Sequence, residues 1–191
     1  MIRRIGGTLV VIILFASCWG EDYSPKPRGY FNIEFPKKQY RQFDQGCAFT
    51  FDYPVYGSVE ADSRDTRPCW YNLVFSRFNG RLHLTYYDVT SKAEFESLAE
   101  DARTFAFKHT VKANAIDQKL INYPDKRVYG IYYAIEGNTA SSIQFFLTDS
   151  AKHYFRGALY FSERPQFDSI QPVVEFIRVD VDRLIGTFKW K

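Results

Sequence analysis

The spacing of apolar and polar residues predicts a chain built mainly of β-strands. From residue 30 onward, apolar and aromatic side chains alternate with polar ones in short runs, the pattern of a strand with one buried face. Turn formers separate these runs, and Asn79-Gly80 between two of them is a strong hairpin signal. The expected strands lie at residues 30–35, 47–53, 69–75, 81–89, 115–123, 127–136, 140–148 and 153–161.

A helical pattern interrupts the strands near the middle of the chain. Ser91 and Glu94 have the spacing of a capping box, in which each side chain bonds a free backbone N–H of the first turn. Apolar residues then recur every three or four positions, which predicts a helix over residues 92–113. His109 and Lys112 fall near its end, where cations interact favourably with the helix dipole. That role is sufficient for both, and a place on a partner surface is the alternative.

A second apolar stripe, from Ile170 to Phe188, predicts a C-terminal helix that begins near Asp168 or Ser169. Short connections between about seven strands favour a mainly antiparallel sheet, which the helices would cover. The expected fold class is therefore α/β (α+β). Two aromatic strands followed by a long amphipathic helix and a Thr-Phe close resemble the Mog1/PsbP-like sandwich. That resemblance concerns the fold and carries no function.

Composition narrows the class of protein. Hydrophobic residues make up 46% of the 191 residues and aromatic residues 18%, which excludes a disordered chain. The net charge is only +3 and the basic residues form no long run, so binding to nucleic acid is not expected. The length suits one domain with a substantial core.

The N-terminus has the layout of an export signal. Arg3 and Arg4 precede a short apolar run at residues 9–15, which is too short to span a membrane. Small residues followed by Cys18 resemble a bacterial lipobox, in which the cysteine is acylated and becomes the first residue of the mature protein. Residues 1–17 are then a signal peptide. The alternative is an ordinary cleaved signal followed by an unrelated cysteine.

The chain after Cys18 divides into a tether and a domain. Residues 18–29 contain prolines, a glycine and mixed charges, as expected of an exposed linker between lipid and domain. A docking segment is the alternative, with Arg28 and Tyr30 available to a partner groove. Residues 30–191 form the single α/β sandwich domain.

Cys47 and Cys69 are the remaining cysteines. An exported chain lies in an oxidising compartment, where a disulfide is permitted. Closing the loop between them would stabilise the fold by roughly 3 kcal/mol in the chain-entropy model. Two free buried thiols are the other possibility, and without a nearby histidine the pair does not suggest a zinc site.

The motifs of the common enzyme classes are absent from the sequence. It contains no G-x-S-x-G elbow, P-loop, dinucleotide fingerprint or H-E-x-x-H motif. Its three histidines, His83, His109 and His153, are far apart. Asp149, Ser150 and His153 lie too close in sequence for an ordinary catalytic triad. We therefore expect no enzyme activity, metal or cofactor.

A polar segment separates the two most aromatic strands. Thr148, Asp149 and Ser150 are turn formers, so a hairpin loop accounts for them. Lys152, His153 and Arg156 are not required by a turn. They would place positive charge at one end of the sheet, where an acidic partner surface could dock. Both the structural interpretation and the partner-site interpretation remain open.

Several long motifs resemble the gliding motility lipoprotein GldD family of Bacteroidota. They include "PKPRGYFNIEFPKKQY", "CWYNLVFSRFNG", "HTVKANAI", "VYGIYYAIEGNTASSIQFFLTDSAKHYFRGALYF" and "TFKW". The resemblance covers nearly the whole mature chain. It implies a cell-envelope lipoprotein that faces the periplasm and takes part in the gliding machinery and the associated type IX secretion system, with other envelope proteins as partners. It implies no enzyme activity and does not specify which membrane carries the anchor.

A second hypothesis is a periplasmic domain that binds a small ligand or peptidoglycan. Its basis is the large number of aromatic residues, including Trp70 and Tyr71, which are common in sugar- and ligand-binding pockets. Aromatic residues at these positions are also what a packed core of strands requires.

Overall fold

The alternating runs of the sequence form one large antiparallel sheet. The structure, a computed structural model, describes residues 32–63, 67–162 and 167–191. Seven strands pair side by side, each antiparallel to its neighbour. In spatial order they are β3 (Ser58–Ala61), β4 (Tyr71–Phe75), β5 (Gly80–Asp88), β9 (His153–Phe161), β8 (Ser141–Thr148), β7 (Val128–Gly137) and β6 (Ala113–Tyr123).

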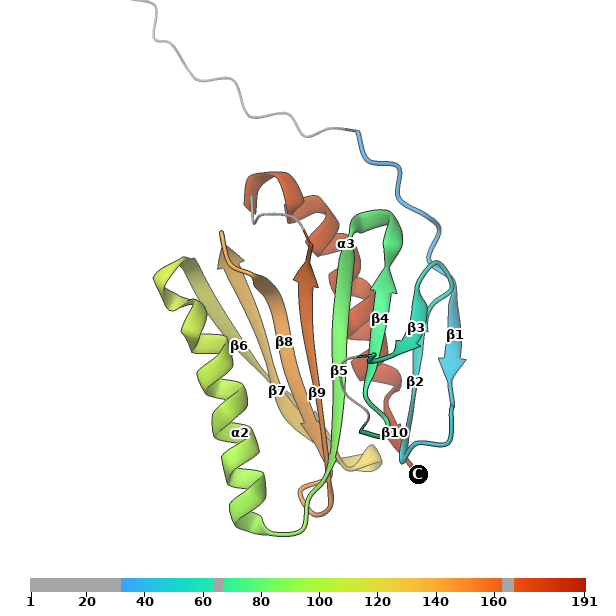
Figure 1. The fold of residues 1–191 in the computed structure, drawn as a ribbon, viewed down its shortest axis with the longest axis vertical. Helices are drawn as coiled ribbons and strands as arrows, with labels where there is room; N and C mark the ends of the chain where they lie inside the picture. Colours follow the sequence, from blue (N-terminus) through green and yellow to red (C-terminus); the bar gives the residue numbers. More distant parts are fainter. Residues whose placement is uncertain (1–31, 64–66, 163–166) are drawn as a thin grey trace, which may run out of the picture. The chain divides into compact units, whose positions relative to one another are not determined.

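A smaller sheet joins segments from both ends of the domain. It contains β1 (Tyr40–Phe43), β2 (Phe49–Pro54) and β10 (Lys189–Trp190), in the order β1-β2-β10. β10 pairs antiparallel with β2, with Trp190 opposite Phe49. This pairing brings the end of the chain to the lower end of the domain in Figure 1, where the β8–β9 loop also lies.

Helices cover both faces of the seven-stranded sheet. Figure 1 shows α2 (Lys92–Phe107) in front of the sheet and α3 (Phe167–Thr187) behind it. The main core lies between the sheet, α3 and β2, and a smaller apolar cluster lies under α2. Alternate residues of β8 therefore face different cores. Phe145 belongs to the α3 side and Phe146 to the α2 side, and every residue of this central strand is buried. Two buried faces explain its apolar run.

Short 3-10 helices close three of the connections. They are η2 (Ser76–Phe78), η3 (Lys108–Val111) and η4 (Pro124–Lys126). The predicted Asn79-Gly80 hairpin joins β4 to β5, with η2 lengthening its turn. Asn79 adopts the left-handed conformation with φ +49°, which asparagine tolerates better than most residues.

The first predicted strand, at residues 30–35, is wrong for the part that the structure describes. Residues 32–35 form no strand, and the first strand begins at Tyr40. Phe35 instead stacks on Phe176 of α3, with ring centroids 4.4 Å apart. Pro36 follows directly and has no N–H to donate to a ladder, which disfavours pairing at this point.

The predicted end of the first helix, residue 113, is also wrong. Ser91 accepts a hydrogen bond from the Glu94 N–H at 3.1 Å, as the capping box predicted, but α2 ends at Phe107. The Thr110 hydroxyl then donates to the Phe107 carbonyl at 2.5 Å. Thr110 and Val111 are β-branched and favour leaving the helix, and Ala113 already belongs to β6.

A buried carboxylate attaches the segment before β1 to α3. Asp180 on α3 is only 1% exposed. Its carboxylate accepts hydrogen bonds from Lys38 Nζ at 2.7 Å, from the Tyr40 hydroxyl at 3.0 Å and from the Tyr56 hydroxyl. Burial, reinforced by the nearby negative charge of Asp180, raises the pKa of Tyr40 to about 12. Burial also lowers the pKa of Lys38, although Asp180 opposes that shift.

Candidate functional site

The loop between β8 and β9 is ordered by a single carboxylate. Asp149 Oδ1 accepts hydrogen bonds from the backbone N–H groups of Ala151, Lys152 and His153 at 3.0, 2.8 and 2.9 Å. The Thr148 hydroxyl accepts from the Ser150 N–H at 2.9 Å. Burial alone would raise the pKa of Asp149, but the three N–H groups stabilise the charged form and lower it. Asp149 is therefore a turn residue that stays ionised.

A basic pocket opens beside this loop. We call it the hairpin-end pocket, and its volume is about 380 Å³. Five of its eight lining residues carry basic side chains, and the lining set is Lys126, Arg127, Asp149, Ala151, Lys152, His153, Trp190 and Lys191. The residues come from three separate parts of the chain: η4 and the position after it, the β8–β9 hairpin, and β10 with the residue that follows. Pairing of β10 with β2 is what brings the third group to the pocket.

Two aromatic rings form one wall of the pocket. His153 stacks on Trp190 with ring centroids 5.1 Å apart and an interplanar angle of 21°. The indole N–H of Trp190 donates to the Arg127 carbonyl at 3.0 Å, which ties the wall to the residue after η4. Lys126 Nζ donates to the carbonyl of Gly186 near the end of α3. The wall and part of the basic rim are therefore held in place by backbone contacts.

The electrostatic balance of the pocket is positive. Asp149 is its single acidic lining residue, and its Oδ1 is used by the three backbone N–H groups. Its Oδ2 lies 3.8 Å from Arg127 Nη2, and the Arg127 side chain remains 68% exposed. Lys191 Nζ pairs with Asp44 outside the lining set. The arrangement suits binding of carboxylates or other anions.

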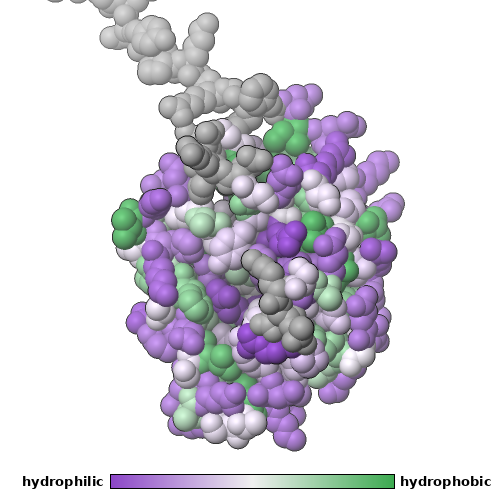
Figure 2. Space-filling view, in the orientation of Figure 1, coloured by the Kyte–Doolittle hydropathy of each residue, from purple (hydrophilic) through white to green (hydrophobic). Residues whose placement is uncertain are grey.

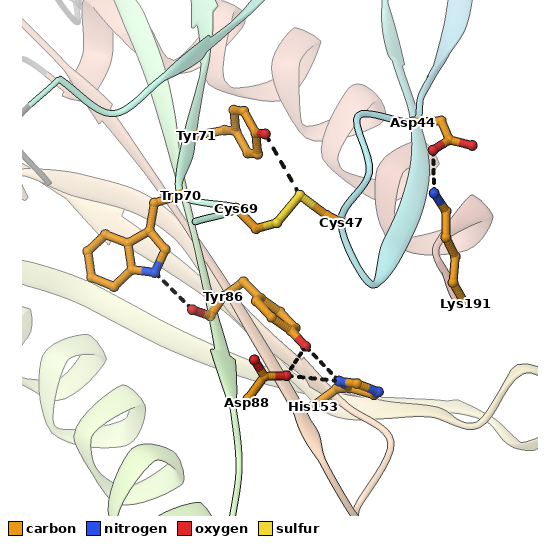
Figure 3. The surroundings of a disulfide bond; sticks show 9 residues. All are labelled: Asp44, Cys47, Cys69, Trp70, Tyr71, Tyr86, Asp88, His153 and Lys191. Carbon is orange, nitrogen blue, oxygen red and sulfur yellow. Dashed lines mark hydrogen bonds and ion pairs between the residues drawn. A yellow bond between two sulfur atoms is a disulfide. The ribbon is translucent and has the colours of Figure 1, made fainter. Parts of the chain in front are cut away.

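His153 is oriented by a network on the other side of its ring. Figure 3 shows the Tyr86 hydroxyl, Asp88 and His153 in a triangle of contacts, with Asp88 Oδ1 3.9 Å from His153 Nδ1. The Tyr86 hydroxyl donates to Asp88 Oδ1 at 2.6 Å and lies 2.7 Å from His153 Nδ1. Because Tyr86 has one hydroxyl proton, both bonds are satisfied when His153 Nδ1 carries a proton and donates to the tyrosine. Burial, followed by the hydrogen bond to Asp88, raises the pKa of Tyr86.

A second hollow lies next to the disulfide. Cys47 and Cys69 are joined by a disulfide bond, with Cα atoms 5.8 Å apart (Figure 3). The hollow has a volume of about 380 Å³ and is lined by Gly46, Cys47, Ala48, Arg67, Pro68, Cys69, Tyr86, Tyr87 and Asp88. The Arg67 guanidinium lies 3.6 Å from the centroid of the Trp70 ring. Tyr86 and Asp88 therefore connect this hollow to the hairpin-end pocket.

The structure brings together only part of the residues that the sequence suggested. Asp149, Lys152 and His153 line the hairpin-end pocket, whereas Arg156 does not. Arg156 Nη2 donates to Gln144 Oε1 at 2.8 Å, and its guanidinium lies 4.9 Å from the Phe105 ring on the α2 side. An offset of three residues from His153 reverses the face of a strand, so the two side chains point to opposite sides of the sheet.

The other suggested residues lie elsewhere. His109 is in η3 and Lys112 follows it, and neither lines the pocket. Burial lowers the pKa of His109. Cys18, Arg28 and Tyr30 lie outside the residues that the structure describes.

Several pocket residues were missed from the sequence. Lys126, Arg127 and Lys191 carry no motif, Trp190 belongs to the TFKW motif without a suggested role, and the four become neighbours only through the tertiary fold. Tyr86 and Asp88 were detectable in principle, since β5 was expected as a strand. However, their approach to His153 depends on the β5–β9 register, in which Asp88 stands opposite His153.

The described residues contain no group of three or more His, Cys, Asp or Glu side chains that could hold a metal ion. Asp149 and His153, two of the three residues considered as a possible triad, make hydrogen bonds to different partners. Asp149 Oδ1 accepts from backbone N–H groups, and the His153 ring bonds Tyr86. Among these same residues, no helix combines the length and apolar character that crossing a bilayer requires.

Comparisons with known proteins address the family and the fold. A family model described as "Gliding motility lipoprotein GldD" matches residues 20–190. No curated protein matches the chain. The solution structure of cyanobacterial PsbP (CyanoP) from Synechocystis sp. PCC 6803 is similar, with a TM-score of 0.52 and 7% identity. The match covers 87% of this chain and 99% of that chain. At this identity the likeness shows the fold alone, and it confirms the expected PsbP-like sandwich.

Proposed function

This chain belongs to the gliding motility lipoprotein GldD family, as its motifs indicated, and from this membership we propose its function. In our proposal it is a non-enzymatic component or assembly factor of the gliding machinery and the associated type IX secretion system. The lipoprotein family implies association with the cell envelope. In this proposal, acylated Cys18 holds the domain at a membrane, and the domain binds envelope proteins.

The hairpin-end pocket is the proposed docking site. The observation that supports this proposal is that five basic side chains line a single pocket of about 380 Å³. That volume suits a few side chains better than a folded domain. We propose that it takes the Asp or Glu side chains of an acidic partner segment. Charged groups at such a rim raise the association rate and select partners by sign of charge.

The surface supports a charged contact. Figure 2 shows a mainly hydrophilic face with scattered hydrophobic residues. The exposed large hydrophobic residues among those described are spread along the chain: Val55, Phe105, Val111, Leu120, Tyr123 and Val179. A stable contact with a partner at the lower end of the domain would therefore depend on polar and charged groups.

The test is crosslinking and pulldown of the full-length chain from native membranes. In the variant Arg127→Glu/Lys152→Glu, two basic rim residues become acidic, and we expect loss of defined envelope partners. The control Arg81→Glu/Lys108→Glu makes the same charge change at exposed positions on β5 and just after α2, and it should retain those partners. Equal recovery from the two variants, each with wild-type thermal stability, would contradict the docking site.

Membrane attachment is tested separately. We expect Cys18→Ala to release the protein from membranes and to abolish partner recovery. If this variant remains membrane-bound with the same partners, acylation of Cys18 is not the anchor.

A second candidate function is binding of a small ligand or a peptidoglycan fragment at the hollow beside the disulfide. It is favoured by the volume of about 380 Å³ and by the Arg67 side chain stacked on Trp70. A cell-wall fragment that binds there should raise the melting temperature, and Trp70→Ala should remove that shift. Unchanged melting across a panel of fragments contradicts this candidate.

A further inference from the structure

The outer edge of β6 is long and open. Within the part of the chain that the structure describes, β6 pairs with β7 alone and forms one border of the seven-stranded sheet (Figure 1). It spans Ala113–Tyr123, whereas β3 at the opposite border has only four residues. An unpaired edge of this length presents a row of backbone donors and acceptors on which another strand can pair.

The side chains of β6 alternate between two differently covered faces. Ile116 packs against the apolar cluster under α2, and Ile121 belongs to the core on the α3 side. Because successive strand residues point to opposite faces, Leu120 shares the face of Ile116. Asp117 and Lys119 share the face of Ile121. Leu120 is 71% exposed although it is a large aliphatic residue in a regular strand.

The order of these side chains is self-complementary. If two copies of β6 pair antiparallel about a two-fold axis at Gln118, Asp117 of each copy stands opposite Lys119 of the other. Ile116 of each copy then stands opposite Leu120 of the other. Directly opposed residues of an antiparallel pair lie on the same face with Cβ atoms about 4.5–5.5 Å apart. The register therefore gives two opposite-charge pairs on one face and two aliphatic pairs on the other.

We propose that β6 is the interface of a homodimer in which two sheets join edge to edge in this register. The occupant of the edge is a second copy of the chain, because the pattern complements itself in both charge and apolarity. A two-fold arrangement is also the commonest symmetry of soluble oligomers. The dimer would carry two lipid anchors and two hairpin-end pockets, and thus bind a partner with repeated acidic segments by avidity.

Charge reversal tests the interface with the full-length protein in detergent, its mass measured by light scattering. Wild type should be a dimer. Asp117→Lys places like charges opposite each other twice and should weaken dimerisation by about tenfold. The double variant Asp117→Lys/Lys119→Asp restores opposite charges and should restore the dimer. As a control, exchange of the exposed pair Lys92 and Glu96 on α2 should leave the dimer unchanged.

The register is tested by cysteine crosslinking in native membranes. Gln118→Cys places the two sulfurs at the symmetry axis, so non-reducing gels should show a disulfide-linked dimer. Leu120→Cys alone should not crosslink, whereas Ile116→Cys/Leu120→Cys should. A monomeric wild type together with no Gln118→Cys dimer overturns the proposal, and Asp117 and Lys119 are then charges that keep the edge from pairing.

Discussion

Replacement of Asp149 tests the interpretation of the β8–β9 loop. One oxygen of this carboxylate accepts three backbone N–H groups at 2.8–3.0 Å, and the side chain is only 9% exposed. Hydrogen bonds to charged groups contribute about 1.5–3 kcal/mol each, but the three share one acceptor and water replaces part of them. We therefore expect Asp149→Ala to lower the free energy of unfolding by about 2–4 kcal/mol. Asp149→Asn keeps an oxygen acceptor without the charge and should cost about 1 kcal/mol.

The same contacts fix the sign of a pH dependence. The three N–H groups outweigh burial and hold the pKa of Asp149 below its usual value of 3.8. The folded state then binds fewer protons than the unfolded state between the two pKa values. The stabilisation is complete above the unfolded-state pKa and is lost as the pH falls through the folded-state pKa. Wild type and Asp149→Ala should therefore converge in stability as the pH is lowered from about 5 toward 2.

The assay is urea unfolding followed by circular dichroism, at neutral pH and across the acid range. Asp101→Ala is the control, because Asp101 is exposed on α2 and alanine is a good helix former. If Asp149→Ala costs no more than this control, or its deficit stays constant down to low pH, the carboxylate does not organise the loop as described.

Four further predictions concern the rest of the domain. Reducing the disulfide should lower the free energy of unfolding by about 2–4 kcal/mol, measured by urea melts with and without reductant. Asp180→Asn should destabilise the fold by about 3–5 kcal/mol, because the Lys38 ammonium and the Tyr40 and Tyr56 hydroxyls lose their negatively charged acceptor. A melting temperature equal to that of wild type would refute this. Since the pKa of Tyr40 is raised to about 12, wild-type stability should fall as the pH rises from about 10 toward 12, visible in alkaline melts. Gly130→Ala should prevent folding, because the added Cβ would lie 1.8 Å from the Phe146 carbonyl oxygen. The Cβ added by Gly186→Ala has no neighbouring atom within 4 Å, so this control should stabilise α3 by about 0.5–1 kcal/mol.

Much of the fold was predictable because local patterns agree with the tertiary structure. The aromatic runs of β7, β8 and β9 fill both faces of the sheet, so their hydrophobicity alone identifies them. Ser91 fixes the start of α2 through a local hydrogen bond. The short strands β1, β3 and β10 were missed. They have four, four and two residues, too few to show a period, and they exist because neighbouring strands offer a ladder.

The hairpin-end pocket could be predicted only in part. The sequence indicated Lys152 and His153 because they follow a turn between two core strands. Arg156 could have been excluded by its odd offset from His153. Lys126 and Lys191 could not be found, because their approach depends on how η4 and the segment after α3 meet the hairpin. Such long-range approaches leave no periodic signal in the chain.

Site-specific photo-crosslinking in native membranes tests most directly whether the hairpin-end pocket binds a partner protein. A photo-reactive amino acid replaces Lys152 at the hairpin-end pocket or, as the control, the exposed Lys108 just after α2. We predict that position 152 crosslinks to an Asp- and Glu-rich segment of another envelope protein, identified by mass spectrometry, and that position 108 does not. If the two positions give the same products, or if position 152 gives none, the pocket is not where this lipoprotein binds its partners.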